Sequence, residues 1–164
     1  MGEDASPAED RWTGSVLPVA EADLPELLVL MRGYCDFYEV DPRDEDLLAL
    51  ARTLLEDPEK DGVQLIARDG RGDAVGFATI YWSFSTHRTG RLGVMNDLFV
   101  APAARGQRVG ERLIEACLER CHERGALALE WETALDNERA QALYDRVGGK
   151  RERWLSYSLE TPRP

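Results

Sequence analysis

The chain has 164 residues, 43% of them hydrophobic and 31% charged, which fits one soluble globular domain and excludes a collagen-like chain, a disordered chain and a disulfide scaffold. Its net charge is −11, and the excess acid lies entirely in residues 1–100 with no basic stripe, so a nucleic-acid partner is not expected. No apolar run reaches the roughly 18 residues that a membrane-spanning helix needs, so no membrane partner is expected.

The first hundred residues predict an acidic tail, one strand, two helices and an antiparallel meander. Residues 1–12 are acidic without an apolar core, which indicates a flexible tail rather than a secretory signal, and residues 13–164 are then a single domain. Asp23 followed by Glu26 is a variant of the capping box, and the apolar spacing that follows predicts a helix. The elements expected are a strand at 15–19, helices at 24–38 and between 41 and 58, and strands at 63–68, 74–84 and 91–100, with an Asp-Gly turn at 68–73.

After residue 100 the pattern changes to an alternation of helices and strands. A loop over 101–110 runs into a helix that ends near Gly125, followed by a strand at 126–133. Asp136 or Asn137 caps a last helix that Gly148 ends, and residues 151–159 are expected to form a final strand. The order of elements predicts a mixed α/β fold.

The chain contains three cysteines, Cys35, Cys117 and Cys121. An odd and sparse set of cysteines indicates reduced thiols and favours a cytoplasmic protein. Cys117 and Cys121 lie four residues apart beside His122, but no other group of cysteines or histidines in the sequence completes a metal site. We therefore expect buried thiols, since free cysteine behaves as a small hydrophobic residue, and we expect no metal.

The loop Arg105-Gly106-Gln107-Arg108-Val109-Gly110 joins a strand to a helix, an arrangement that presents free backbone N–H groups to an anion. Gly106 and Gly110 allow a ligand to approach the backbone, and Arg105 and Arg108 can contact phosphate. The loop is not a Walker loop, because the Gly-Lys-Ser/Thr ending is absent, and its glycines are not spaced as in a dinucleotide fingerprint. An ordinary glycine-bearing helix start is the alternative.

A second motif follows the next expected strand. Asn137, Ala140, Leu143, Tyr144 and Gly148 match the pattern Asn-x-x-Ala-x-x-Leu/Phe-Tyr-x-x-x-Gly. Together with the loop at 105–110, which fits Arg/Gln-x-x-Gly-x-Gly/Ala, this pattern resembles the GNAT superfamily of acyl-CoA-dependent N-acetyltransferases over residues 14–160. The loop departs from the family at Arg108, which stands where the family has its middle glycine. An arginine fits there if its backbone dihedrals are those of a helix.

The resemblance implies an α/β GNAT fold, with a mixed, mostly antiparallel central sheet of about six to seven strands flanked by about four helices. Strands 91–100 and 126–133 would run parallel and splay apart, and acetyl-CoA, the cosubstrate, would bind between them. Its pantetheine arm would pair with the backbone of Leu98, Phe99 and Val100. Its diphosphate would contact the N–H groups of Gln107, Arg108, Val109 and Gly110.

The resemblance also implies catalytic roles. A backbone N–H near Leu98 or Phe99 would polarise the thioester carbonyl, aimed by a bulge in this strand. Tyr144 would protonate the departing thiolate, the alternative being a core aromatic on an amphipathic helix. Asn137 would hydrogen-bond the pantetheine or cap its helix, and the two roles are compatible.

An amine must lose its proton before it attacks a thioester, so the site needs a proton acceptor, acting directly or through water. The candidates are Asp97, Glu130 and Glu132. Asp97 lies beside Asn96 in an apolar strand, where a carboxylate needs a partner or a role. We take Asp97 as the catalytic candidate and Asn96, Asp97 and Glu132 as substrate-binding candidates. A structural hydrogen-bond acceptor is the alternative for Asp97.

Residues 81–86 and 96–100 are similar to the diamine, polyamine and thialysine acetyltransferase branch of the superfamily. Asn96 stands where that branch has its catalytic glutamate, and an asparagine cannot accept a proton. Further candidates for the acceptor pocket are Trp82, Phe84, Tyr34, Tyr38 and Glu39, the last to hold an ammonium group. A core position for the aromatic side chains of Trp82 and Phe84 and a solvated face for Glu39 are the alternatives.

The acidic first part of the chain would attract a cationic acceptor, although it would equally serve solubility. We expect acetyl transfer to a primary amine of a small cationic acceptor (a polyamine, a diamine or a lysine-like amine) by direct attack in a ternary complex. The alternative acceptors are an amino-acid α-amine, an aminoglycoside or a protein amine. A non-catalytic acyl-CoA-binding sensor is the alternative from another class. The branch that the chain resembles implies a homodimer.

Overall fold

The computed structural model describes residues 12–162, so the predicted tail at 1–12 lies outside the described residues except for Trp12. The chain divides into two units, of which the first runs to Glu132 and the second begins at Thr133. The first unit holds the sheet and three helices, and the second holds the last helix and the C-terminal segment. Among the residues described, no helix is long and apolar enough to cross a membrane.

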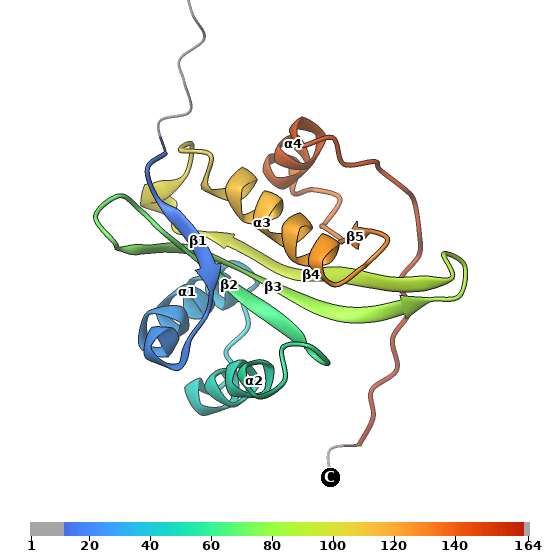
Figure 1. The fold of residues 1–164 in the computed structure, drawn as a ribbon, viewed down its shortest axis with the longest axis horizontal. Helices are drawn as coiled ribbons and strands as arrows, with labels where there is room; N and C mark the ends of the chain where they lie inside the picture. Colours follow the sequence, from blue (N-terminus) through green and yellow to red (C-terminus); the bar gives the residue numbers. More distant parts are fainter. Residues whose placement is uncertain (1–11, 163–164) are drawn as a thin grey trace, which may run out of the picture. The chain divides into compact units, whose positions relative to one another are not determined.

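The sheet of the first unit follows the order of the chain (Figure 1). In the described residues its strands are β1 (Ser15–Pro18), β2 (Gly62–Arg68), β3 (Ala74–Ser85), β4 (Gly90–Val100) and β5 (Leu129–Glu130). Neighbours from β1 to β4 are antiparallel, which confirms the predicted meander, and β5 runs parallel to β4, as the resemblance implies.

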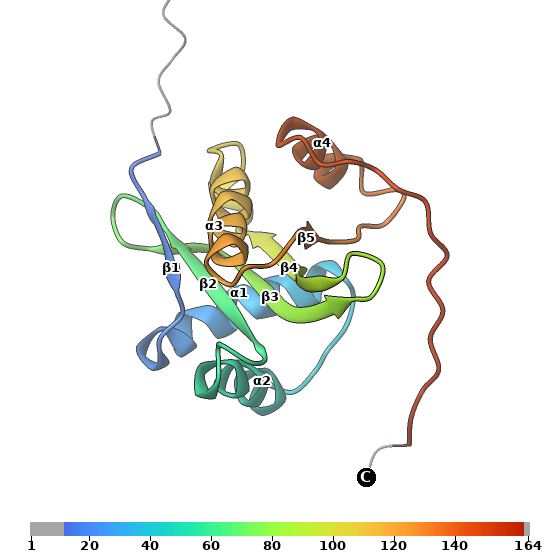
Figure 2. The same ribbon diagram turned by 45° about the vertical axis from the view of Figure 1, so that its right-hand side comes forward.

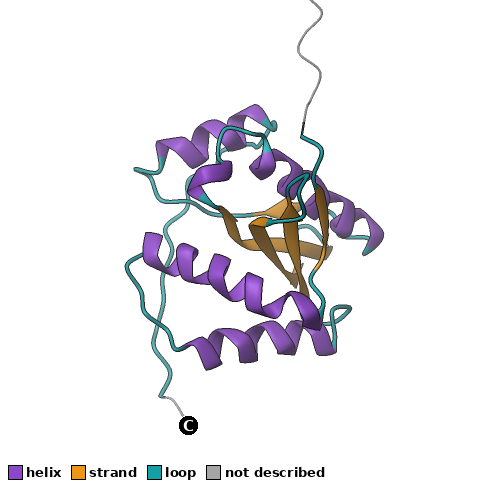
Figure 3. Cartoon of the chain, turned by 90° about the vertical axis from the view of Figure 1, so that its left-hand side faces the viewer, coloured by secondary structure: helices purple, strands orange, loops and turns teal. Residues whose placement is uncertain are grey.

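Helices α1 (Leu24–Phe37) and α2 (Asp44–Glu56) lie on one face of the sheet, and α3 (Val109–Glu123) lies on the other (Figures 1 and 2). Figure 3 shows the first two helices side by side. The core between these helices and the sheet includes Leu27, Met31, Ile66, Phe77 and Phe99. Helices on both faces of a mixed sheet confirm the predicted α/β class.

The three cysteines are free and buried, as predicted. Cys35 lies in α1, whereas Cys117 and Cys121 lie on the side of α3 that packs on the sheet with Leu113. Burial raises the pKa of Cys117 and raises the pKa of Cys121 to about 11. Both thiols of α3 therefore stay protonated at neutral pH and serve as small apolar side chains.

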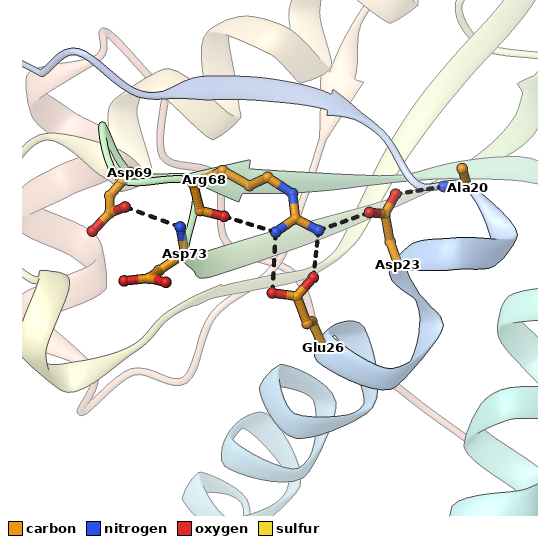
Figure 4. Close-up of polar contacts among 7 residues, drawn as sticks. Ala20, Asp23, Glu26, Arg68, Asp69 and Asp73 are labelled. Carbon is orange, nitrogen blue, oxygen red and sulfur yellow. Dashed lines mark hydrogen bonds and ion pairs between the residues drawn. The ribbon is translucent and has the colours of Figure 1, made fainter.

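Arg68, at the end of β2, holds the start of α1 (Figure 4). Its guanidinium donates to Asp23 at 2.7 Å and to Glu26 at 2.6 Å. Asp23 also accepts from the Ala20 N–H at 2.8 Å and makes no capping bond to the helix. The predicted capping box is therefore wrong, because Arg68 engages the two carboxylates that the motif would use.

The second unit contains α4 (Glu138–Arg146), which brings the helices of the described residues to the predicted four. The Asn137 side chain accepts a hydrogen bond from the Ala140 N–H at 3.2 Å and so caps this helix. Gly148 ends it with a left-handed backbone at φ 84°, as the sequence predicts.

The sheet has fewer strands than predicted. β5 covers only part of the strand expected at 126–133, and residues 151–159 form no strand, so residues 12–162 give five strands instead of six or seven. The apolar side chains of the C-terminal segment, Trp154, Leu155, Tyr157 and Leu159, are 81–96% exposed. A run of β-favouring residues predicts a side-chain surface suited to a sheet, but a strand also needs a hydrogen-bonding partner that the run does not specify.

Candidate active site

A bulge interrupts β4 at Asn96. Thr79 on β3 pairs with Asp97, and the next residue of β3, Ile80, pairs with Met95, so Asn96 has no opposite residue on β3. An extra residue in one strand bends that strand and changes the direction of the groups beside it. The bulge implied by the resemblance is therefore present, and it adjoins the candidate catalytic carboxylate.

Hydrogen-bond donors gather around Asp97. The side-chain amide of Asn96 donates to the Asp97 carboxylate at 3.0 Å. The hydroxyl of Tyr34, on α1, donates to the backbone carbonyl of Asn96, the residue before Asp97, at 3.5 Å. The pKa values of Tyr34 and Tyr81 are both raised. Burial is the larger cause, and the negative charge of Asp97 is the next. Both phenols therefore stay protonated at neutral pH and can donate a hydrogen bond beside the carboxylate.

The position of Tyr81 follows from the alternation of side chains along β3. Thr79 and Tyr81 lie two residues apart and so point to one face, and Thr79 is opposite Asp97 in the neighbouring strand. Sequence reasoning missed both residues as neighbours of Asp97. The β3–β4 register, which depends on the bulge, is what places them there.

The end of α1 supplies a second group of candidate residues. The ring of Tyr38 lies 4.9 Å from the ring of Tyr34, centroid to centroid. Glu39 follows Tyr38 with a left-handed backbone at φ 55° and is exposed to solvent. Glu39 is thus next in the chain to Tyr38, whose ring packs against Tyr34, the residue that donates to the Asn96 carbonyl.

The parallel pair of strands parts soon after it forms. β4 pairs with β5 only at Gly93 and Val94. Within the described part of the chain, residues 97–100 pair with β3 on one edge and with no strand on the other. The carbonyl of Val100 accepts from the Arg105 side chain at 2.9 Å. Pairing between the parallel strands therefore ends before the residues expected to bind pantetheine, as a divergence of the two strands would require.

The loop before α3 has a left-handed backbone at two positions, Gly106 (φ 80°) and Arg108 (φ 64°, ψ 10°). The condition under which an arginine would fit this position without strain, helical dihedrals, is therefore not met. Arg108 takes the conformation that a glycine would adopt at lower cost in free energy. Arg108 stands where the family has its middle glycine. A glycine at that position indicates a turn with a positive φ, and Arg108 adopts the same backbone conformation.

This loop has the donors that a phosphate group needs. α3 begins at Val109, and the first N–H groups of a helix have no partner inside the helix. A Cβ built on Gly106 would meet no atom within 4 Å, so nothing crowds that point of the loop. Arg105 and Arg108 bring two guanidinium groups to the same loop. The diphosphate of acetyl-CoA fits this set of donors.

Trp82 and Phe84, the aromatic residues of β3 that were expected to line the acceptor pocket, do not lie beside Asp97. Trp82 and Phe84 alternate with Tyr81 and so point to the face of β3 opposite Thr79. The indole N–H of Trp82 donates to the carbonyl of Pro58 at 2.8 Å. Phe84 is 73% exposed, with the guanidinium of Arg91 4.7 Å from its ring centroid. The structure does not bring these two side chains to Asp97.

The three candidate carboxylates have different surroundings. Glu130 forms an ion pair with Arg88 at 2.7 Å. Glu132 lies two residues beyond the end of β5 and is exposed. Asp97 is the candidate that lies beside the bulge and the phenol groups, so it has the geometry expected of an amine-binding carboxylate.

Asn137 and Tyr144 belong to α4, in the second unit. Asn137 is the N-cap residue, which confirms the capping half of the expectation and leaves its pantetheine contact a prediction. Tyr144 lies seven residues later, and its carbonyl accepts the Gly149 N–H that closes the helix at 2.8 Å.

The model of the acetyltransferase (GNAT) family matches residues 27–149. The chain belongs to the GNAT family. An uncharacterized N-acetyltransferase of Bacillus subtilis, YhfO, is 31% identical over 142 residues, which cover 86% of this chain and 93% of YhfO. A crystal structure of a probable acetyltransferase matches with a TM-score of 0.79 at 26% identity, covering 92% of this chain and 99% of the other. The protein is thus a GNAT acetyl-CoA-dependent N-acetyltransferase.

Two curated relatives with a named substrate match about half of the chain in sequence. The D-amino-acid N-acetyltransferase HPA3 of Saccharomyces cerevisiae is 39% identical over 84 residues, 51% of this chain and 52% of its own. A thialysine N-epsilon-acetyltransferase of Bos taurus is 33% identical over 76 residues, 46% of this chain and 44% of its own. These partial matches agree with the family and leave the branch within it open.

Proposed function

We propose that the acceptor of this N-acetyltransferase is a small cationic primary amine that binds with its amino group at Asp97. The observation that carries this proposal is the placement of Asp97 beside the β4 bulge, with the Asn96 amide 3.0 Å from its carboxylate. A carboxylate attracts an ammonium group and can accept its proton, directly or through water. Asn96 cannot accept a proton, so in this proposal it orients Asp97.

The next proposed roles belong to the residues of β4 that follow Asp97. Acetyl-CoA supplies the acetyl group as a thioester. In the proposal the backbone of Leu98, Phe99 and Val100 binds the pantetheine arm, and an N–H of Leu98 or Phe99 polarises the thioester carbonyl. The support is that residues 96–100 have, in the described chain, no strand partner on one edge.

The diphosphate is assigned to the loop before α3. Its ligands in the proposal are the backbone N–H groups at 107–110, with the guanidinium groups of Arg105 and Arg108. Tyr144 is proposed to protonate the departing thiolate, and Asn137 to contact pantetheine as well as capping α4. The motif of the family supports these two assignments.

Charge supports a cationic acceptor. Residues 1–100 carry all of the excess negative charge of the chain. Asp36 and Glu39 lie near Tyr38 at the end of α1, and Tyr34 of the same helix donates a hydrogen bond to the Asn96 carbonyl. Negative potential at the entrance to a site concentrates cations there. The partial similarity to a thialysine acetyltransferase agrees with an acceptor of this class.

An amino-acid α-amine is the second candidate acceptor, favoured by the partial similarity to a D-amino-acid acetyltransferase. Such an acceptor carries a carboxylate as well as an ammonium group, so its site needs a cation beside Asp97. The excess negative charge of residues 1–100 favours the cationic amine over this second candidate.

The test is thiol release from acetyl-CoA across spermidine, putrescine, thialysine, lysine, aminoglycosides, neutral amino acids and a basic peptide. We expect turnover with the cationic amines, and Asp97→Asn should lower kcat/KM by about 100-fold or more while acetyl-CoA affinity is kept. Glu130→Gln makes the same chemical change at a carboxylate paired with Arg88, and it should stay within about twofold.

The outcomes separate the alternatives. An unchanged kcat/KM in Asp97→Asn would remove the role proposed for Asp97. Turnover confined to neutral amino acids would favour the α-amine acceptor. Retained acetyl-CoA binding with no turnover on any amine would favour a sensor.

We further propose that the protein is a homodimer, as the branch it resembles implies. Light scattering at micromolar concentration should then give twice the 18.4 kDa mass of the chain. A monomer mass under these conditions would contradict the proposal.

A further inference from the structure

Two polar side chains are buried in the middle of the sheet. Among the described residues, the buried polar residues are Gln64, which is 4% exposed, and Thr79, which is 0% exposed. Their neighbours along the same strands, such as Leu65 and Ala78, are apolar and equally buried. Burying a polar side chain opposes folding unless the group is hydrogen-bonded, so this pair needs an explanation.

The explanation begins with the strand register. Gln64 on β2 is opposite Thr79 on β3, and Thr79 is opposite Asp97 on β4. Directly opposite residues point to the same face, with their Cβ atoms about 5 Å apart. The three residues therefore form one row across three strands, and the row ends at the carboxylate proposed to bind the amine.

The hydrogen bond within the row has a direction. The side-chain N–H of Gln64 donates to the Thr79 hydroxyl oxygen at 3.2 Å. Because Gln64 already donates to this oxygen, the single proton of the Thr79 hydroxyl is left for another acceptor. A carboxylate accepts hydrogen bonds and donates none when ionised, and Asp97 is the carboxylate on the far side of Thr79.

The orientation of Gln64 fits this reading. Its amide oxygen is buried and has no hydrogen-bond partner, and Gln64 lines a cavity of about 80 Å³ together with Val19, Ala51 and Leu54. The reverse orientation would place the oxygen against Thr79 and draw the hydroxyl proton away from Asp97. In the orientation present in the structure Gln64 does not accept that proton, and the strand register places Asp97 opposite the Thr79 hydroxyl.

We propose that Thr79 and Gln64 are positioning residues for Asp97, in which Gln64 fixes the Thr79 hydroxyl so that it donates to the Asp97 carboxylate. This inference rests on the proposed role of Asp97. In it, Asn96 and Thr79 hold the carboxylate from two directions, so that its remaining lone pairs face the acceptor amine. The pair in the core acts through Asp97 and touches no substrate.

A double-mutant cycle tests this coupling. Thr79→Val keeps the shape of the side chain and removes the hydroxyl, and Thr79→Ser keeps the hydroxyl. In the wild type we expect Thr79→Val to lower kcat/KM by about 10-fold and Thr79→Ser to retain most of the activity. In the Asp97→Asn background Thr79→Val should cost less than about twofold. Equal losses in both backgrounds would overturn the inference and leave the proposed function intact, provided that Asp97→Asn alone lowers activity.

A second measurement needs no acceptor. A hydroxyl proton held in a buried hydrogen bond exchanges slowly and gives its own proton NMR signal. We expect a protected Thr79 hydroxyl signal that is absent in Thr79→Val and moves in Asp97→Asn. A signal that Asp97→Asn leaves in place, or no protected signal in the folded wild type, would overturn the contact whatever the acceptor is. Gln64→Leu should speed the exchange of this proton, because it frees the hydroxyl to rotate.

Discussion

Arg108 and Glu111 form an ion pair across the first turn of α3, with the Arg108 side-chain nitrogen 3.5 Å from the Glu111 carboxylate. Arg108 makes this contact from a left-handed backbone at φ 64°, which a residue with a Cβ adopts at a cost of about 1–2 kcal/mol. Its guanidinium is thereby held at the loop that we assign to the diphosphate. Strain of this kind persists only where the surrounding structure imposes it.

Two substitutions at Arg108 separate the backbone conformation from the charge. Arg108→Gly and Arg108→Ala both remove the guanidinium, but only glycine relieves the left-handed backbone. We expect the glycine variant to be more stable than the alanine variant by about 1 kcal/mol, or about 2–4 °C in Tm. Both should weaken acetyl-CoA binding to a similar degree, measured by calorimetry. Equal Tm values would contradict the conformation, and wild-type affinity in both would remove Arg108 from the diphosphate site.

The contact of Arg68 with Asp23 and Glu26 predicts a pH-dependent stability. The Ala20 N–H and then Arg68 lower the pKa of Asp23, and Arg68 lowers the pKa of Glu26. A carboxyl whose pKa is lowered on folding stabilises the protein above its ordinary pKa, near 4, and loses this contribution as the pH falls through the lowered value. We expect Arg68→Met to cost about 1–2 kcal/mol at pH 7, discounted because the group is partly exposed, and less as the pH falls toward 3.

The measurement is thermal unfolding of both proteins from pH 7 to pH 3. Arg71→Met, in the β2–β3 turn, is the control, because the Arg71 side chain is far more exposed than that of Arg68. It should leave Tm nearly unchanged throughout. A difference between wild type and Arg68→Met that stays constant with pH would show that lost packing, and not the ion pairs, causes it.

The elements that sequence predicts well here are those fixed by local spacing. The apolar period gave α1 and α3 near their observed bounds, and the Asp-Gly turn gave the β2–β3 hairpin. Features decided by distant residues were wrong. The capping box failed because Arg68, 42 residues beyond Glu26, takes its carboxylate, and the last strand failed because no partner pairs with it in the described chain.

The candidate site shows the same division. Asp97 and the loop at 105–110 were predicted, since their residue types and spacing match the chemistry of the family. Thr79 and Tyr81 were not, because they become neighbours of Asp97 only through the β3–β4 register and the bulge that shifts it. A single residue of register reverses every side chain beyond it, and nothing in the composition of β3 states where the shift occurs.

Trp82 distinguishes a structural role from a place in the acceptor pocket. Its indole N–H donates to the Pro58 carbonyl at 2.8 Å, so Trp82→Phe leaves that carbonyl without its donor. We expect a loss of about 1 kcal/mol in stability, with KM for the acceptor amine within about twofold of wild type. Phe84→Ala, at an exposed position of the same strand face, should change neither quantity. A rise in KM of fivefold or more in Trp82→Phe would return Trp82 to the acceptor pocket.

Asn137 has one observed role and one proposed role, and two variants separate them. Its side chain caps α4 through the Ala140 N–H at 3.2 Å, so Asn137→Ala should lower stability by about 1 kcal/mol. Asn137→Ser restores a capping oxygen on a shorter side chain that carries no amide N–H. If the amide also binds pantetheine, the serine variant recovers Tm but not acetyl-CoA affinity, measured by differential scanning fluorimetry and calorimetry. If serine restores both quantities, capping alone accounts for the asparagine, because the two side chains share only the acceptor that the helix needs.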